Sequence, residues 1–119
     1  MRVYIAGPYQ PKNCSMHSAP KVTQQNVNHA IDAFYEIVED GHEPYVPHLS
    51  HYIHLRGDVD LEADFWYKYD MSFLDHWAEA IYMLKGWEDS YGSRKELERA
   101  KELKLRVVYE EYLRIKGEQ

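Results

Sequence analysis

The alternation of apolar and polar positions divides the first part of the chain into a strand, a loop and a helix. Val3 to Ala6 is a short apolar run closed by a glycine and a proline, which predicts a buried strand followed by a turn. Residues 10 to 20 are polar and are expected to form a loop. From about Lys21 to Val38, apolar residues recur every three or four positions, and Gly41 follows as a terminator. This pattern predicts an amphipathic helix.

The middle of the chain adds a short extended segment and a second helix. The segment Pro44 to Pro47 has two prolines, so any strand there is brief, and residues 48 to 59 are expected to be a loop or a loose helix. A helix from about Asp60 is predicted by aromatic residues that recur every three or four positions on one stripe. These residues are Trp66, Tyr69, Phe73 and Trp77.

The last part of the chain again has the order strand, helix, strand. Ala80 to Leu84 is an apolar run of strand length, and residues 85 to 92 are expected to form a loop. A third helix carries the apolar residues Leu97, Ala100 and Leu103. Residues 105 to 109 are predicted to be the final strand, and residues 110 to 119 a frayed helix.

Strands that alternate with helices in this way build a parallel sheet covered by helices. The sequence therefore predicts an α/β fold with three layers and a small parallel sheet of four or five strands. In such sheets, ligands bind beyond the carboxyl ends of the strands, where the strand order reverses. We expect the loops after the first and third strands, residues 7 to 9 and 86 to 92, to face each other at that place.

The composition is that of one ordinary globular domain over residues 1 to 119, with 45% hydrophobic and 29% charged residues. Cys14 is the only cysteine, which excludes an intrachain disulfide and a four-cysteine zinc site and fits a cytoplasmic location. No segment reads as a signal peptide or a membrane span, so no membrane partner is expected. A net charge of −6 opposes binding to a nucleic acid polymer, although a small anionic ligand can still be held locally.

Asp70 is a candidate for acid chemistry because it lies on the apolar stripe of the second helix, between Trp66 and Phe73. Partial burial raises the pKa of a carboxyl group, and a carboxylic acid that stays protonated near neutrality can give its proton to a leaving group. The alternative is that Asp70 lies at the edge of the stripe and pairs with Lys68 or with a backbone amide.

Glu96 lies where a loop meets the third helix, and its surroundings allow two interpretations. Ser93 three residues before it completes a capping-box pattern, in which the glutamate only binds the amide of the N-cap residue. In the functional interpretation, the amides and dipole of the helix start hold Glu96 ionised, as a nucleophile requires, while Ser90, Gly92 and neighbouring amides receive a phosphate. The local sequence does not decide between the two.

Three motifs resemble those of the nucleoside 2-deoxyribosyltransferase superfamily, which includes the 2′-deoxynucleoside 5′-monophosphate N-hydrolases. The first is the run from Tyr4 to Pro8, the second is Asp70 ahead of an apolar pair and a strand, and the third is Ser90-x-Gly92-x-x-x-Glu96-x-x-x-Ala100. The resemblance extends from the first strand to the third helix. It implies a flavodoxin-like, Rossmann-like fold.

The resemblance also implies a role for each matching residue. Glu96 would attack the anomeric carbon and form a glycosyl-enzyme intermediate, and Asp70 would assist the departure of the base. Tyr4 would position the nucleophile, and Ser90 would bind the 5′-phosphate in the hydrolases. Such a reaction fits a retaining mechanism, in which two carboxyl groups lie about 5 Å apart, one attacking the sugar and the other protonating the leaving group. In better-known members a residue from a neighbouring subunit completes the site, and this chain has no recognisable counterpart.

Further residues are expected to bind the substrate or to pack the core. The predicted substrate-binding residues are Gly7, Pro8, Tyr9, His48, Ser90 and Gly92. Four aromatic residues could stack on a base, although core packing is the expected use of most of them: Tyr45, Tyr52, Trp66 and Trp87.

The triplet His48-x-x-His51-x-x-His54 has residues that could bind a metal ion, but its spacing does not favour a metal site. Steps of three residues drift around a helix, so the first and last histidines would not share a face, and no carboxylate lies inside the triplet. We therefore expect no metal, with His48 helping to hold a substrate. Gly7-Pro8 is not a dinucleotide-binding fingerprint, and no cofactor is expected.

The expected function is hydrolysis of the N-glycosidic bond of a nucleoside 5′-monophosphate. A transferase that passes the sugar to a second base is the nearest alternative, and a nucleotide-binding module without turnover is the alternative from another class. The retention of Tyr4, Asp70 and Glu96 argues against a pure binding module. A homodimer or higher homo-oligomer is expected from the aromatic content of so short a chain and from the resemblance.

Overall fold

The computed structural model describes residues 1–10 and 19–111 and has an α/β fold, as predicted. Its sheet has four strands, all parallel, in the order β2-β1-β3-β4. The strands are β1 (Arg2–Ala6), β2 (Glu43–Tyr45), β3 (Ala80–Met83) and β4 (Arg106–Tyr109).

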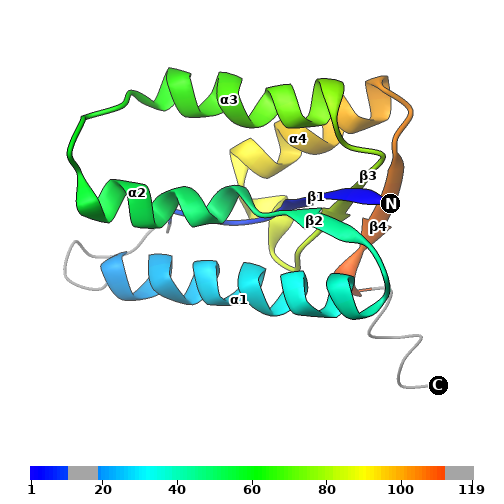
Figure 1. Ribbon diagram of the computed structural model, residues 1–119, viewed down its shortest axis with the longest axis horizontal. Helices are drawn as coiled ribbons and strands as arrows, with labels where there is room; N and C mark the ends of the chain where they lie inside the picture. Colours follow the sequence, from blue (N-terminus) through cyan, green and yellow to red (C-terminus); the bar gives the residue numbers. More distant parts are fainter. Residues whose placement is uncertain (11–18, 112–119) are drawn as a thin grey trace.

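Helices cover both faces of this sheet, which gives the three layers of a flavodoxin-like fold (Figure 1). Helix α1 covers one face, and α3 and α4 cover the other. The helices are α1 (Ala19–Glu39), α2 (Ser50–Arg56), α3 (Ala63–His76) and α4 (Tyr91–Glu102), with short 3-10 turns η1 (Pro47–Leu49) and η2 (Trp87–Asp89).

The pleat of β1 divides the core between the two faces, because successive side chains of a strand point to opposite sides. Val3 and Ile5 pack in the cluster that includes α1. Tyr4 and Ala6 pack in the cluster formed with α3 and α4. Tyr4 is completely buried, and it therefore lies on the face covered by the two helices that carry Asp70 and Glu96.

The structure shifts some of the predicted boundaries. The segment predicted to be a loop or a loose helix is helical, because η1 leads directly into α2. Helix α3 begins three residues later than about Asp60, since Glu62 has the extended backbone of an N-cap residue. The predicted loop of residues 85 to 92 contains η2 and the start of α4. Most of the predicted loop after β1 and of the predicted last helix lies outside the described residues.

The loops after β1 and β3 meet at the carboxyl edge of the sheet, as predicted. The chain runs from β1 to β2 on one side of β1 and later to β3 on the other, so the strand order reverses between β1 and β3. A side chain at Gly7 would put its Cβ 2.6 Å from Cβ of Leu84. Gly86 also contacts Pro8, but a Cβ there would lie at an ordinary 3.4 Å from Cγ of Pro8, so glycine is favoured at residue 86 by its φ of +96°. Close packing therefore requires glycine at residue 7.

Candidate active site

A cavity of about 570 Å³ opens at this carboxyl edge, and most of the predicted site residues line it. Seven of the nine belong to its wall: Gly7, Tyr9, His48, Asp70, Ser90, Gly92 and Glu96. Tyr4 reaches the site through a hydrogen bond to Glu96. Pro8 is not among the lining residues, and its carbonyl oxygen instead accepts a hydrogen bond from His48.

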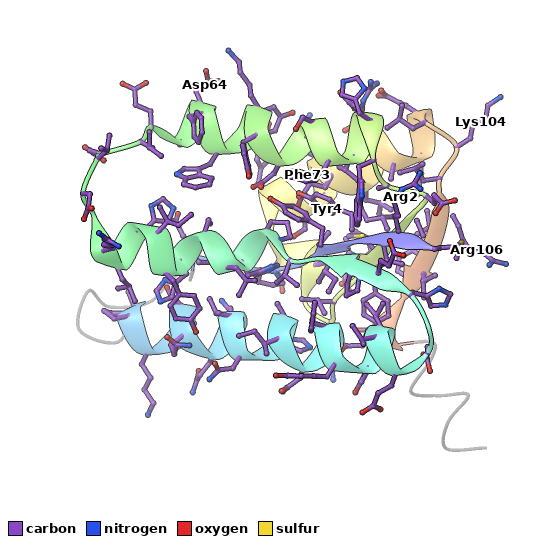
Figure 2. The ribbon with its side chains drawn as sticks, in the orientation of Figure 1. Arg2, Tyr4, Asp64, Phe73, Lys104 and Arg106 are labelled. Atoms are coloured by element: carbon purple, nitrogen blue, oxygen red, sulfur yellow. The ribbon has the colours of Figure 1, made fainter. Side chains whose placement is uncertain are left out.

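Glu96 is held by a tyrosine from the centre of the sheet. The hydroxyl group of Tyr4 donates a hydrogen bond to Oε2 of Glu96. Desolvation by the surrounding protein raises the pKa of Glu96 to about 8; the hydrogen bond from Tyr4 opposes this shift, and the nearby charge of Asp70 adds to it. Burial also raises the pKa of Tyr4 well above its usual range, so its hydroxyl group remains a hydrogen-bond donor. Figure 2 shows Tyr4 and Phe73 on the α3 side of the sheet.

Two predictions for Glu96 are wrong: that it caps the third helix, and that the helix start holds it ionised. Ser90, rather than Ser93, is the N-cap residue of α4, and its Oγ accepts hydrogen bonds from the amide and the hydroxyl group of Ser93 at 3.3 and 2.9 Å. Because α4 begins at Tyr91, Glu96 lies in its second turn, where the helix-start amides do not reach it. Desolvation therefore dominates, and Glu96 is neither a cap nor held ionised by the helix start.

Asp70 has the raised pKa that its place on the apolar stripe predicts. Burial raises the pKa of Asp70 to about 6, and a hydrogen bond from Tyr45 opposes that shift. The hydroxyl group of Tyr45 donates to Oδ1 of Asp70 at 3.0 Å. Pairing with Lys68 is wrong, because Lys68 forms an ion pair with Asp64 at 3.1 Å on the solvent-exposed side of α3.

The start of α4 forms the wall of the cavity nearest to Ser90. The amides of Tyr91 and Gly92, the first two residues of the helix, have no carbonyl partner within the helix. Gly92 is exposed, and a Cβ added there would meet no atom within 4 Å. Backbone amides and a serine hydroxyl group that border open space are suited to an anionic group such as a phosphate.

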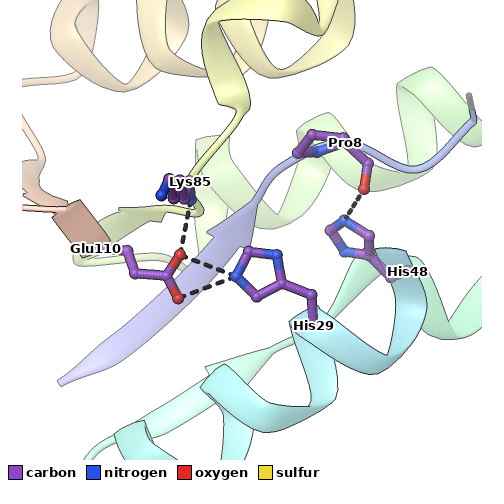
Figure 3. Close-up of polar contacts among 5 residues, drawn as sticks. All are labelled: Pro8, His29, His48, Lys85 and Glu110. Atoms are coloured by element: carbon purple, nitrogen blue, oxygen red, sulfur yellow. Dashed lines mark hydrogen bonds and ion pairs between the residues drawn. The ribbon is translucent and has the colours of Figure 1, made fainter. Parts of the chain in front are cut away.

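His48 is fixed in one tautomer by the loop after β1. Its Nε2 lies 3.1 Å from the carbonyl oxygens of both Gly7 and Pro8, so Nε2 carries the hydrogen (Figure 3). Burial lowers the pKa of His48 to about 4, so the ring is neutral and its Nδ1 is an acceptor. Within the described part of the chain, Nδ1 has no hydrogen-bond partner.

The other two histidines of the triplet pack around Tyr9. Nδ1 of His51 lies 3.1 Å from the hydroxyl group of Tyr9, and the ring of His54 stacks against Tyr9 at 6.4 Å between centroids. His54 also contacts Trp66 edge to face, and both line the cavity. The described residues contain no group of three histidine, cysteine, aspartate or glutamate side chains that could hold a metal ion.

Three further residues contribute to this site, although the sequence favoured core packing for Tyr45 and Trp66 and gave no site role to His54. Tyr45 donates a hydrogen bond to Asp70, and Trp66 and His54 line the cavity. The only sequence signal for Tyr45 was its place in the short extended segment from Pro44 to Pro47, and the pairing of that segment with β1 is known from the structure. Tyr4 and Tyr45 are register partners in the parallel sheet.

A second polar cluster, which the sequence did not predict, lies on the α1 side of the same sheet edge. Nε2 of His29 lies 2.9 and 3.1 Å from the two carboxylate oxygens of Glu110, and the amide of Lys85 donates to Oε1 of Glu110 at 2.8 Å (Figure 3). The cluster ties α1 to the segments that follow β3 and β4. His29 also lowers the pKa of His48 slightly, after the larger effect of burial.

No helix in the described part of the chain has the length and apolar character needed to cross a membrane.

Comparison with known proteins adds one assignment. No curated protein matches the sequence significantly. A family model described as a domain of unknown function, DUF1937, matches residues 1–111 and so includes every residue of the cavity described above. The chain belongs to the DUF1937 family.

Proposed function

We propose that this protein hydrolyses the N-glycosidic bond of a nucleoside 5′-monophosphate through a glutamyl glycosyl-enzyme intermediate. The observation that carries the proposal is a pair of carboxyl groups in one cavity wall, Asp70 and Glu96, each bound by a tyrosine hydroxyl group. Retaining glycosidases use such a pair, since one carboxylate attacks the anomeric carbon and the other acid protonates the leaving group. The resemblance to the deoxyribosyltransferase superfamily favours the same reaction.

In the first step, a carboxylate oxygen of Glu96 forms a bond to C1′ of the sugar. The bond between C1′ and the base nitrogen breaks, its electron pair goes to the base, and Asp70 gives the base its proton. In the second step, water attacks C1′, and the Asp70 carboxylate takes a proton from that water. The bond to Glu96 breaks with its electron pair returning to the carboxylate, so both side chains regain their starting states.

The proposed reaction needs one proton on the pair of carboxyl groups formed by Asp70 and Glu96, and their pKa values agree with this. Values of about 6 for Asp70 and about 8 for Glu96 mean that the pair holds about one proton at neutral pH. The higher pKa favours that proton on Glu96 in the free protein, whereas the reaction needs it on Asp70. Positive charge that develops at C1′ as the bond to the base breaks stabilises a carboxylate at Glu96, which favours the arrangement with the proton on Asp70 in the transition state.

The lining of the cavity includes groups suited to the phosphate and to the base of a nucleotide. In this proposal, Ser90 and the free amides at the start of α4 bind the 5′-phosphate, because helix-start amides that border a cavity favour an anion. The aromatic rings of Tyr9, His54 and Trp66 offer a surface on which a base can stack. The single cysteine and a nucleotide substrate both fit a cytoplasmic enzyme.

The reaction is tested by incubating the protein with a panel of ribo- and deoxyribonucleoside 5′-monophosphates and measuring free base. We expect one or more of them to release base and sugar phosphate in equal amounts. A second free base is then added to the same assay, and its incorporation into a new nucleotide would establish the transferase instead. Tight nucleotide binding without release of base would establish a binding module and refute the hydrolase.

A homo-oligomer is the expected assembly. Ile53 of α2 is 55% exposed, and Phe65 and Tyr69 of α3 are each 44% exposed. All three border a groove of about 480 Å³ that shares Trp66 with the candidate active site. Apolar side chains gathered in this way are stabilised when a partner removes them from water.

A further inference from the structure

Two neighbouring strands each supply a tyrosine that binds one carboxyl group of the cavity. Tyr4 of β1 and Tyr45 of β2 are register partners, and their ring centroids lie 5.7 Å apart. Tyr4 donates to Glu96 on α4, and Tyr45 donates to Asp70 on α3. The sheet register therefore sets two parallel pairs of a tyrosine and a carboxyl group side by side.

The Tyr45 ring is held in place by aromatic contacts that do not involve its hydroxyl group. It stacks on Phe73 with centroids 3.9 Å apart and an angle of 12° between the ring planes, and it meets Trp77 edge to face at 6.3 Å. Phe73 follows Asp70 by three residues on α3, so the same helix face presents both the stacking ring and the carboxyl group. A ring fixed in this way holds its hydroxyl group at a constant position against Asp70.

We propose that Tyr45 is a positioning residue, whose hydroxyl group anchors Oδ1 of Asp70 so that Oδ2 carries the proton given to the departing base. This inference rests on the proposed N-glycosidase reaction. As the bond between C1′ and the base breaks, the proton on Oδ2 moves to the base and Asp70 becomes a carboxylate. The hydrogen bond from Tyr45 strengthens as that charge develops, because bonds to charged acceptors are stronger than bonds to neutral ones. Tyr45 thus acts through Asp70 and need not touch the substrate.

Charged and titratable groups around Asp70 can affect its pKa, so a pH titration of Asp70 has to take them into account. Those facing it from other elements are Tyr45, Tyr4 and Glu96, and Tyr69 and Lys68 lie beside it on α3. Lys68 is engaged with Asp64. Burial raises the pKa of Tyr45 far above its usual range, so this tyrosine does not titrate where the carboxyl groups do. A change in the titration of Asp70 can therefore be assigned to loss of the Tyr45 hydroxyl group.

The test uses Tyr45→Phe, which keeps the ring stacked on Phe73 and removes only the hydroxyl group. Tyr67→Phe is the matched control, since Tyr67 lies on α3 and is 53% exposed. With a purine nucleotide that the protein hydrolyses, Tyr45→Phe should lower kcat about 10- to 100-fold with little change in KM. The loss should shrink for the 7-methyl derivative, whose base leaves without protonation. Adding Tyr45→Phe to Asp70→Asn should cost little more than Asp70→Asn alone.

A measurement that needs no turnover separates this inference from the proposed function. The carboxyl group of Asp70 is titrated by NMR in protein labelled with ¹³C at aspartate, with Asp70→Asn identifying the signal. In Tyr45→Phe the pKa of Asp70 should rise by about one, since a hydrogen bond to the charged form is lost, and it should not move in Tyr67→Phe. An unchanged pKa of Asp70 in a folded Tyr45→Phe protein overturns the anchoring role, whether or not the protein hydrolyses nucleotides. A raised pKa in a protein that releases no base keeps the anchor and removes the proposed reaction.

Discussion

The hydroxyl group of Tyr4 donates a hydrogen bond to Oε2 of Glu96, which joins the centre of the sheet to the second turn of α4. Tyr4 is completely buried, so this bond fixes the carboxyl group against a rigid part of the core. In the proposed reaction, this contact would hold the carboxylate in position to attack C1′.

Glu96→Gln should abolish most turnover while leaving nucleotide binding largely intact. The amide still accepts the hydrogen bond from Tyr4, but it cannot attack C1′, so kcat should fall by a factor of about 10³ or more. Base release and equilibrium nucleotide binding are measured on the same preparation. Near-normal turnover by a folded Glu96→Gln protein would contradict the covalent mechanism.

Asp70→Asn should lower the rate of base release by a factor that depends on the leaving group. Loss of a general acid costs about 10² to 10⁴ in rate when the base must be protonated. The defect should be smaller with a 7-methylated purine nucleotide, because that base departs without a proton. Steady-state kinetics with the two substrates give the ratio, and an equal defect for both would exclude Asp70 as the acid.

The raised pKa of Glu96 predicts a stability difference that needs no substrate. A carboxyl group whose pKa is about 8 in the folded protein and 4.5 when unfolded must take up a proton on folding between these values. Its contribution to stability is therefore complete below about pH 4.5 and is lost as the pH rises to about 8. Glu96→Gln does not titrate, so its free energy of unfolding relative to wild type should increase from pH 5 to pH 8. Denaturant unfolding at several pH values measures this, and a constant difference would mean that Glu96 titrates normally.

Two glycines of the cavity should respond differently to the same substitution. Gly7→Ala would place a methyl group 2.6 Å from Leu84, and such overpacking typically costs about 1 to 3 kcal/mol. Gly92→Ala meets no atom within 4 Å, so its stability should be unchanged or slightly higher, while nucleotide binding weakens as the methyl group enters the cavity. Thermal unfolding and binding assays separate the two effects. Equal stability of the two variants would show that the contact with Leu84 is not tight.

Self-association is predicted from the exposed apolar side chains of α2 and α3. Sedimentation at micromolar concentration should show a dimer or a larger species. Replacing Phe65, which is 44% exposed, by Glu should shift the protein toward monomer, whereas Lys101→Glu on α4 should not. A wild-type protein that is only monomeric under these conditions would remove the predicted interface.

Much of the fold could be predicted because its signals are local. Apolar runs such as Ala80 to Leu84, and the periodicity of the helices, depend on residues close together in the sequence. The start of α4 shows the limit of such signals. Both Ser90 and Ser93 are good N-cap residues, and only the backbone conformation of Ser90 decides that it caps the helix and leaves Glu96 free of that role.

The sequence by itself determined the α/β class and the order of the elements, and it made Asp70 a candidate for a raised pKa, because a place on the apolar stripe of a helix follows from local spacing. Only the tertiary structure decided the partners of the two carboxyl groups. Tyr4 and Glu96 are separated by 92 residues, and Tyr45 and Asp70 by 25. Such contacts depend on strand register and on how helices pack across the sheet, and no local pattern encodes either. The dominance of desolvation over the helix dipole at Glu96 follows from the same packing, since a pKa reflects everything that surrounds the group in space.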